Sequence, residues 1–448
     1  MRANLGAWLE DTLLRRVLRN TGYLFSSATI AMALTSAQGI LAALLLGPGE
    51  YGALGIVVLF TSSVNRLLSF RMGEMVIKYG GQSLALGKKE QAGAVIKIAG
   101  IAEALTSLVA FALLLALAPW AARFFIKDAS YAPWISLFGA TILVNLITET
   151  STAVLQIGNH YRSQALLNLA QSLVTAGFIT AAFFLKGGLR EVLIAYIAGK
   201  AIFGIGIAVF ALRCMPDLVG RNWLRIPLSG LPNRAEIARF AISTNLSGTI
   251  NMVIRDSEVL WVGFFFTKVE AGYYKFALAV MNILLAPVIP LINTTSPEIN
   301  NLVALRAWPD LRNLLKRTSL LAAAWTGACI TGVLLVGNWF LTILKNGAFQ
   351  PSFAAILILL LGYGFANILF WNRPLLLALG NPNYPLVVML VVGLVKIGLM
   401  LAFVRSWGFL GQAGLLTGYF VFSVGWIVLG GLAFLRRQEQ QPSPAVQP

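Results

Sequence analysis

Long runs of apolar residues dominate the chain, and short polar breaks separate them. An α-helix needs about 20 consecutive apolar residues to cross a bilayer, whereas the strands of an outer-membrane barrel alternate apolar and polar positions. The breaks hold Pro, Gly or charged residues, as at Gly47-Pro48-Gly49 and Asn381-Pro382-Asn383. The pattern predicts an all-α polytopic membrane protein with about twelve spans, at residues 22–46, 51–70, 93–117, 134–157, 165–185, 191–212, 239–266, 271–293, 318–343, 353–378, 384–405 and 410–435.

Composition excludes most other classes of protein. Hydrophobic residues make up 58% of the chain and charged residues 11%, against about 25% charged in ordinary soluble domains. A soluble enzyme, a disordered chain and a disulfide-rich secreted module are therefore excluded. His160, Cys214 and Cys329 are the chain's whole complement of histidine and cysteine, so no convincing metal site can be assembled and we expect no cofactor. With no Walker A motif and no long loop, we expect the chain not to be an enzyme.

The ends of the chain lie outside the predicted spans. No small-residue cleavage site follows the first apolar run, which we interpret as a signal anchor. Residues 1–21 before it have an apolar side and basic residues elsewhere, a pattern that fits a helix lying in the membrane interface. A simple extension of the first span fits equally well. Residues 438–448, with Gln, Pro and Ser, are expected to be disordered.

Basic residues in the loops predict the orientation. With twelve spans both termini lie on one side of the membrane, and the regions on that side carry twenty Lys and Arg against seven on the opposite side. Because cytoplasmic loops hold the excess of Lys and Arg, we expect both termini in the cytoplasm. This placement also explains most of the net charge of +17 without any nucleic acid.

The two halves of the chain repeat one another. Glu50-Tyr51-Gly52 matches Glu270-Ala271-Gly272, and Gly158-Asn159 matches Gly380-Asn381. Lys127 and Pro133 match Lys345 and Pro351, and all three offsets are close to 220 residues. Six spans in each half give a parallel repeat, whose two bundles can rock about a site between them. The predicted domains are the N-terminal bundle 22–212, a basic cytoplasmic linker 213–238 and the C-terminal bundle 239–437.

Charged residues within the spans form the candidate site. Placing one charged side chain at the bilayer centre costs about 2.5–3.5 kcal/mol of insertion free energy, so such residues should face a cavity and not lipid. Seven are basic and four acidic, so a cationic cavity for an anionic cargo is the favoured interpretation. Snorkelling to the headgroups and internal pairing are the alternatives. Arg255 with Glu258, or Lys200 or Lys396 with Glu103 or Glu149, are the pairs considered. The candidate substrate-binding residues are Arg66, Lys97, Lys200, Arg255, Arg373 and Lys396, and the candidate ion-coupling residues are Glu103, Glu149 and Asp256. Lys275 lies nearer a span end.

Loose motifs extend over nearly the whole chain. They are Arg19-Asn20, Leu45-Leu46-Gly47-Pro48-Gly49-Glu50-Tyr51-Gly52, Asp256, Glu270-Ala271-Gly272-Tyr273-Tyr274 and Leu379-Gly380-Asn381. With these motifs the chain resembles the polysaccharide flippases of the MATE-like (MOP) superfamily. Ser69-Phe70-Arg71-Met72-Gly73 departs from the family, which usually has a more apolar approach to this glycine. The resemblance implies two six-helix bundles in a V shape, and transport of undecaprenyl-diphosphate-linked oligosaccharides across the bacterial inner membrane.

The sequence thus predicts a flippase for surface polysaccharide biosynthesis such as O-antigen, capsule or exopolysaccharide. Its expected partners are a polyprenyl-diphosphate-linked oligosaccharide, membrane lipids and polysaccharide assembly proteins, with no nucleic acid. The cluster Arg66, Lys97 and Arg373 near the cytoplasmic side is expected to suit the diphosphate. Two alternatives stay open. One is a multidrug exporter of the same architecture, which would favour an acidic cavity, and the other is a non-transporting enzyme or scaffold of polysaccharide assembly.

Overall fold

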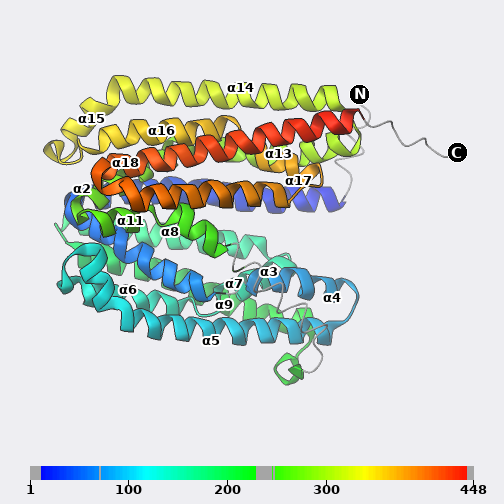
Figure 1. The fold of residues 1–448 in the computed structure, drawn as a ribbon. Helices are drawn as coiled ribbons and strands as arrows, with labels where there is room; N and C mark the ends of the chain where they lie inside the picture. The colour runs from blue at the N-terminus through cyan, green and yellow to red at the C-terminus, as the bar shows by residue number, and fades with distance from the viewer. Residues whose placement is uncertain (1–11, 70–71, 229–244, 246–247, 441–448) are drawn as a thin grey trace. The chain divides into compact units, whose positions relative to one another are not determined.

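In the computed structural model, the described residues are 12–69, 72–228, 245 and 248–440, and within them every regular element is a helix. Figure 1 shows long helices lying side by side, with short connections at their ends. The described residues form two compact units. Unit 1 consists of the described residues within Met1–Leu46 and Ala53–Val253. Unit 2 consists of Gly47–Gly52 and the described residues within Ile254–Pro448.

Unit 1 begins with the long helix α2. Its helices are α2 (Thr12–Leu68), α3 (Met72–Met75), η1 (Val76–Gly80), α4 (Gly81–Ala85), α5 (Lys89–Ala121), η2 (Ala122–Ile126), η3 (Ala129–Tyr131), α6 (Ala132–Val144), α7 (Thr148–Ile157), α8 (Tyr161–Phe184), α9 (Leu189–Val219) and η4 (Trp223–Arg225). Unit 2 contains η6 (Met252–Asp256, which begins at the boundary), α11 (Glu258–Phe265), α12 (Lys268–Leu285), η7 (Ala286–Val288), α13 (Ile289–Ala304), α14 (Trp308–Gly332), η8 (Val333–Gly337), α15 (Asn338–Ile343), η9 (Leu344–Gly347), α16 (Ser352–Ile368), α17 (Asn372–Ala378) and α18 (Asn383–Glu439).

Two of these helices are long enough for more than one crossing. Both α2 and α18 are 57 residues long, and each contains one residue with non-helical backbone angles, Gly47 in α2 and Gly408 in α18. Both residues lie at breaks that the sequence predicts. In the described part of the chain nine helices are long and apolar enough to span a membrane. The all-helical polytopic fold is therefore confirmed, while the number twelve stays a prediction.

Several predicted boundaries differ from the observed helices. The first part of the predicted linker 213–238 continues α9 as far as Val219, followed by η4. Residues 229–238 lie outside the described residues, as do 1–11 of the predicted N-terminal interfacial helix and 441–448 of the predicted tail. From Thr12 the chain runs as helix directly into the first predicted span.

Backbone angles repeat between the two halves. A positive φ is uncommon for residues other than glycine. Among the described residues twelve have a positive φ, six of them glycines, and most lie between helices or at a break within one. Eight of them form four pairs at spacings of 218 to 222 residues, the offset found in the sequence repeat. The pairs are Gly87 with Arg306, Lys127 with Lys345, Asn159 with Gly380, and Lys186 with Gly408.

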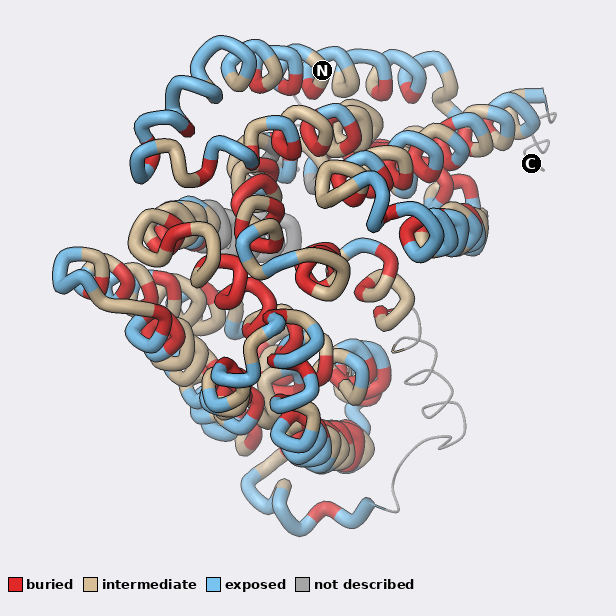
Figure 2. The backbone as a smooth tube through the Cα atoms, turned by 60° about the vertical axis from the view of Figure 1, so that its left-hand side comes forward, coloured by how far each residue is buried: buried red, intermediate tan, exposed pale blue. Residues whose placement is uncertain are grey.

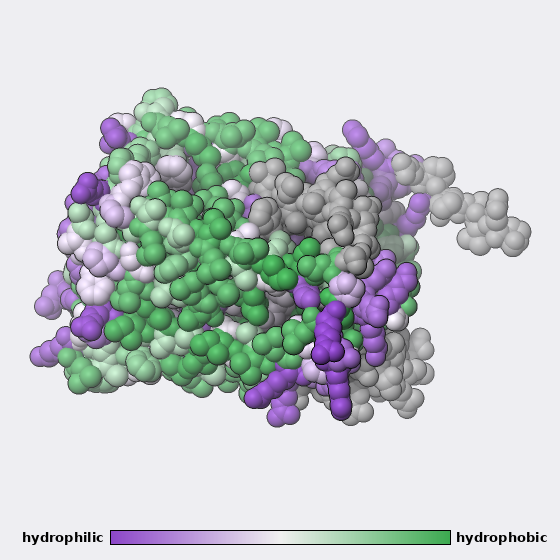
Figure 3. Space-filling model, turned by 90° about the horizontal axis from the view of Figure 1, so that it is seen from below, coloured by the Kyte–Doolittle hydropathy of each residue, from purple (hydrophilic) through white to green (hydrophobic). Residues whose placement is uncertain are grey.

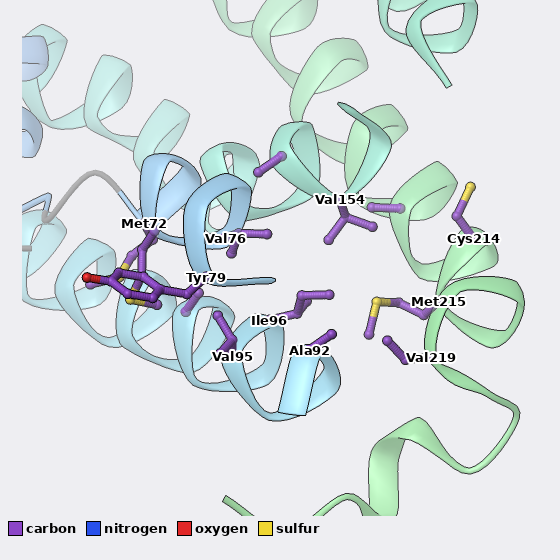
Figure 4. Packing of buried hydrophobic residues seen from close by; sticks show 14 of the residues in the cluster. Met72, Val76, Tyr79, Ala92, Val95, Ile96, Val154, Cys214, Met215 and Val219 are labelled. Carbon is purple, nitrogen blue, oxygen red and sulfur yellow. The ribbon is translucent and has the colours of Figure 1, made fainter. Parts of the chain in front are cut away.

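Many of the helices bury one side and expose another, as Figure 2 shows by buried and exposed residues that alternate within successive turns. Figure 3 shows apolar side chains over the middle of the visible surface and hydrophilic ones toward the helix ends, the distribution expected for helices in a bilayer. In unit 1 a cluster that includes Met72, Val95, Val154 and Met215 joins α3, α5, α7 and α9 (Figure 4). Since lipid tails are as apolar as these side chains, close van der Waals packing holds such helices together.

Candidate functional site

A break in the helices of unit 1 gathers polar groups. Helix α6 ends at Val144 and α7 begins at Thr148, so the first backbone N–H groups of α7 have no intrahelical acceptor. The buried carboxylate of Glu103 on α5 accepts the backbone N–H groups of Glu149 and Thr150, at 2.8 and 2.9 Å. Negative charge at a helix N-terminus is stabilising. Glu103 therefore anchors the start of α7.

The same cluster extends to the end of α2. Ser69 Oγ donates to Glu149 Oε1 at 3.3 Å, and Asn245 Nδ2 donates to the carbonyl oxygen of Ser69 and, at 3.4 Å, to that of Arg66. Unit 1 thus brings together two predicted site residues, Glu103 and Glu149, and it links them to a third, Arg66, through the backbone carbonyl that Asn245 contacts. We name Arg66, Ser69, Glu103, Glu149 and Asn245 the unit 1 polar cluster. The Glu149 side chain is exposed and Arg66 is half-buried.

Lys97 lies six residues before Glu103 on α5 and binds the chain after α9. Its Nζ donates to the carbonyl oxygens of Leu224 and Ile226, at 2.7 and 3.2 Å. Ile226 is itself buried against α5, where a Cβ at Gly93 would lie 2.4 Å from its Cδ1. In this conformation Lys97 thus fastens the start of the predicted linker to unit 1.

Unit 2 contains a buried ion pair. Lys396 on α18 and Glu258 at the start of α11 are 4% and 1% exposed, and Lys396 Nζ contacts Glu258 Oε1. The ammonium also donates to the carbonyl oxygen of Ile254 at 2.6 Å. The other oxygen of Glu258 accepts from Tyr274 OH at 2.9 Å and from Gln412 Nε2 at 2.8 Å. We name Glu258, Tyr274, Lys396 and Gln412 the unit 2 buried network.

This network differs from the pairings that the sequence suggested. Lys396 pairs with Glu258, which had been considered as the partner of Arg255, and the Arg255 Nε instead lies 3.1 Å from Asp256 Oδ1. The reason is geometric, since η6 places Arg255 and Asp256 with partly exposed side chains whereas Glu258 is turned inward. Gln412 was not singled out from the sequence, and Tyr274 was named there only as part of a family motif, without a role or a partner. Nothing in a single polar residue of an apolar span marks it as the partner of a particular carboxylate.

The remaining candidates lie on two helices. Lys200 is half-buried near the middle of α9, next to Gly199, whose close approach to α8 leaves no room for a Cβ beside Thr175 Oγ1. Arg373 is exposed in the first turn of the short helix α17. Arg66, Lys97 and Lys200 belong to unit 1, and Arg255, Arg373 and Lys396 to unit 2. Among the described residues, no group of three or more His, Cys, Asp or Glu side chains is placed to hold a metal ion.

The repeated Glu-Xaa-Gly motifs meet inside unit 2. A Cβ on Gly52 would lie 1.8 Å from the carbonyl oxygen of Lys268, and one on Gly272 would lie 1.9 Å from that of Pro48. The two glycines are therefore the contact at which α2 and α12 cross. Lys268 Nζ lies 3.7 Å from Glu50 Oε1. Lys275 Nζ lies 4.0 Å from the centre of the Tyr51 ring, and it donates to the Tyr51 carbonyl oxygen at 3.3 Å, so this inward-facing lysine of α12 is held by the first repeat.

The fold matches solved membrane transporters over nearly its whole length. An inward-facing multidrug resistance MATE family transporter of the MOP superfamily matches with a TM-score of 0.70 and 14% identity, over 92% of this chain and 96% of that one. The lipid II flippase MurJ, in an inward closed conformation, matches with a TM-score of 0.70 and 14% identity, over 94% and 93%. A MOP superfamily transporter from Pyrococcus furiosus matches with a TM-score of 0.61 and 14% identity, over 93% and 95%. The fold is therefore that of a MATE-like membrane transporter.

The family follows from the sequence. The chain belongs to the polysaccharide biosynthesis protein family, whose model matches residues 40–297. Inner membrane protein YghQ of Escherichia coli (strain K12) is 23% identical over 347 residues, which cover 75% of this chain and 94% of that protein. Together with the apolar helices, these findings define a multi-pass helical membrane protein of the polysaccharide biosynthesis family with a MATE-like fold.

Proposed function

We propose that this protein is a flippase that moves a polyprenyl-diphosphate-linked oligosaccharide from the inner to the outer leaflet of the bacterial inner membrane, with both of its termini in the cytoplasm. The main support for this proposal is that the chain belongs to the polysaccharide biosynthesis family, whose model matches residues 40–297. The fold shared with the lipid II flippase MurJ adds support, because lipid II is also a lipid-linked cargo. Rocking of the two halves would expose the cargo headgroup to each side in turn.

The basic side chains fall into two groups in this proposal. Arg66, Lys200, Arg255 and Arg373 are exposed or half-buried, and we propose them as contacts for the diphosphate, which arginine can bind through two parallel hydrogen bonds. Lys97 and Lys396 hold carbonyl groups and a carboxylate in this conformation. They can reach cargo only if those bonds break, so we propose them as positioning residues here.

Coupling to an ion gradient is proposed through acidic residues. Glu149 and Asp256 have partly or fully exposed side chains, which a proton or sodium ion can reach directly. Glu103 is buried beneath the start of α7, so protonation there would act on the helix break. Measuring cargo movement after the proton gradient, the sodium gradient and the membrane potential are each collapsed in turn will identify the driving force.

The decisive experiment is deletion of the gene followed by analysis of the lipid-linked oligosaccharides on the cytoplasmic side of the membrane. We expect one glycan to accumulate, and complementation by the intact gene to remove it. The triple variant R66A/R255A/R373A, expressed at the normal level, should fail to complement. Absence of any accumulated lipid-linked glycan would refute the proposal.

The MATE-like fold supports a second candidate, a multidrug exporter, because the MATE transporter matches with the same TM-score as MurJ. Such an exporter would take cationic drugs, which the surplus of basic residues within the spans disfavours. The deletion strain separates the two functions. Increased sensitivity to several cationic drugs, with an unchanged set of lipid-linked glycans, would favour the exporter.

A further inference from the structure

A cavity in unit 2 is lined by none of the charged residues described above. Its volume is about 420 Å³, and it lies among α12, α16 and the continuous stretch of α14, η8 and α15. One end is bounded by Trp325, whose indole N–H donates to the Leu284 carbonyl oxygen at 2.7 Å and so joins α14 to α12. Toward the other end, Phe353 of α16 lies beside Gly337 of η8.

The wall of the cavity is suited to hydrocarbon and not to water. No charged side chain lines it, and aromatic and aliphatic groups such as Phe276, Val333 and Ile356 make up nearly all of its surface. A buried water needs two to four polar partners, and apolar cavities of this kind stay dry and take up apolar molecules instead. The ligand that fits this wall is therefore a hydrocarbon chain.

The cavity opens onto the surface that faces lipid. Three of its lining residues, Trp325, Val336 and Phe340, are between 42% and 50% exposed. Beside them on η8 and α15 lie the exposed side chains of Leu335 and Trp339, within one candidate membrane span, Trp308–Gly347. The cavity is thus continuous with the protein–lipid interface, and a chain already dissolved in the bilayer can enter it sideways.

We propose that this cavity binds the isoprenoid chain of the lipid-linked cargo, which names the membrane part of the substrate and rests on the proposed function. Gly332 leaves the α14 wall without a side chain at a point where an added Cβ would meet no other heavy atom within 4 Å, which widens the cavity where a chain that carries methyl branches needs room. Phe276, Phe340 and Phe353 offer ring surfaces to its double bonds. A straight saturated acyl chain would leave this widened point unfilled, and unfilled space loses packing energy.

A pair of glycines on α14 provides a matched test. At both Gly332 and Gly327 an added Cβ would meet no other heavy atom within 4 Å, but only Gly332 lines the cavity. Both lie within the same helix, where leucine is a better helix former than glycine. Gly332→Leu should therefore fill the cavity while Gly327→Leu leaves it open, and neither substitution should prevent folding.

Photo-crosslinking tests directly whether an isoprenoid chain occupies the cavity. The full-length protein in lipid nanodiscs is irradiated with geranylgeranyl phosphate that carries a diazirine in its chain, and the labelled residues are mapped by mass spectrometry. We expect labelling of the inner wall, at Phe276 or Ile356, and competition by unlabelled geranylgeranyl phosphate. Labelling should fall about tenfold in Gly332→Leu, equivalent to one decade in affinity, and stay at the wild-type level in Gly327→Leu.

Three results would overturn the cavity assignment: equal labelling in the two variants, labelling confined to the exposed Leu335 and Trp339, or equally strong inner-wall labelling by a diazirine-bearing palmitoyl phosphatidylglycerol. The last would make the ligand a membrane phospholipid. Labelling does not require transport, so the two proposals fail separately. Normal cargo movement without inner-wall labelling refutes the cavity assignment, whereas labelling in a protein that moves no glycan refutes the proposed function.

Discussion

At the scale of single residues, the ion pair between Lys396 and Glu258 shows what sequence reasoning can and cannot reach. A lysine deep in an apolar span is recognisable as costly, and the need for a partner follows. The identity of that partner depends on how α11 and α18 pack, because the two residues are 138 positions apart in the chain. Tyr274 and Gln412, which complete the hydrogen bonds of Glu258, are found only once the helices are placed.

The first prediction concerns this pair. Lys396→Met leaves the Glu258 carboxylate buried without its counter-charge, and removing one partner of a buried pair costs about 3–5 kcal/mol. The double variant K396M/E258Q removes both charges, so it should regain most of the lost stability. Thermal unfolding of the purified protein in detergent measures both effects. Equal losses in the single and double variants would contradict this prediction.

Glu103 supports a second prediction. Glu103→Gln removes the negative charge from the N-terminus of α7 and keeps an oxygen that can accept one hydrogen bond. We expect a loss of about 1–2 kcal/mol and faster hydrogen exchange at residues 149 and 150, whose N–H groups the carboxylate holds. Glu149→Gln is the control, since its exposed side chain does not cap α7. Unchanged exchange at these two amides in Glu103→Gln would contradict the capping role.

At the scale of helices, the apolar runs and their breaks predicted most of the elements. The interruptions at Gly47 and Gly408 were both placed correctly, because Gly and Pro punctuate an apolar pattern clearly. The breaks after Val144 and after Ile368 were not predicted, since no proline or glycine marks either of them. These breaks recur in equivalent helices of the two halves. Sequence pattern therefore locates spans better than it locates interruptions within a span.

The crossing of α2 and α12 gives a third prediction. Gly52→Ala and Gly272→Ala each force a methyl group into a backbone carbonyl that would lie 1.8 or 1.9 Å away, so each should push the helices apart. We expect a loss of at least about 2 kcal/mol from such overpacking, seen as a lower unfolding temperature. Gly418→Ala in α18, where an added Cβ meets nothing within 4 Å, should be neutral within about 0.5 kcal/mol. A similar loss in all three variants would refute the close-contact explanation.

At the scale of the whole molecule, the repeat was visible in the sequence because its loop residues recur at nearly one offset. The structure adds an independent sign of it in the four pairs of positive φ angles. At three of these pairs a non-glycine residue in one half corresponds to a glycine in the other. Backbone conformation has thus been kept where residue identity has not, which is why residue matching alone detected only part of the repeat.

The fourth prediction concerns orientation. The excess of Lys and Arg in the regions on the side of the termini should hold both ends of the chain in the cytoplasm. A green fluorescent protein fused after residue 448 should therefore fluoresce, and alkaline phosphatase at the same position should be inactive. A fusion of alkaline phosphatase within the loop around Lys186-Gly187-Gly188, predicted to face the other side, serves as the positive control. Active phosphatase at the C-terminus would reverse the predicted topology.

The pairing of Lys396 with Glu258 also bears on how an electric field can drive this molecule. An ammonium and a carboxylate that travel together carry no net charge, and the same is true of Arg255 with Asp256. A membrane potential performs about 2.3 kcal/mol of work per elementary charge per 100 mV, and none on a dipole displaced as a unit without rotation. If the protein moves an anionic cargo as proposed, voltage would act on that cargo or on an unneutralised side chain, and it would do no such work on these two ion pairs as long as they stay intact.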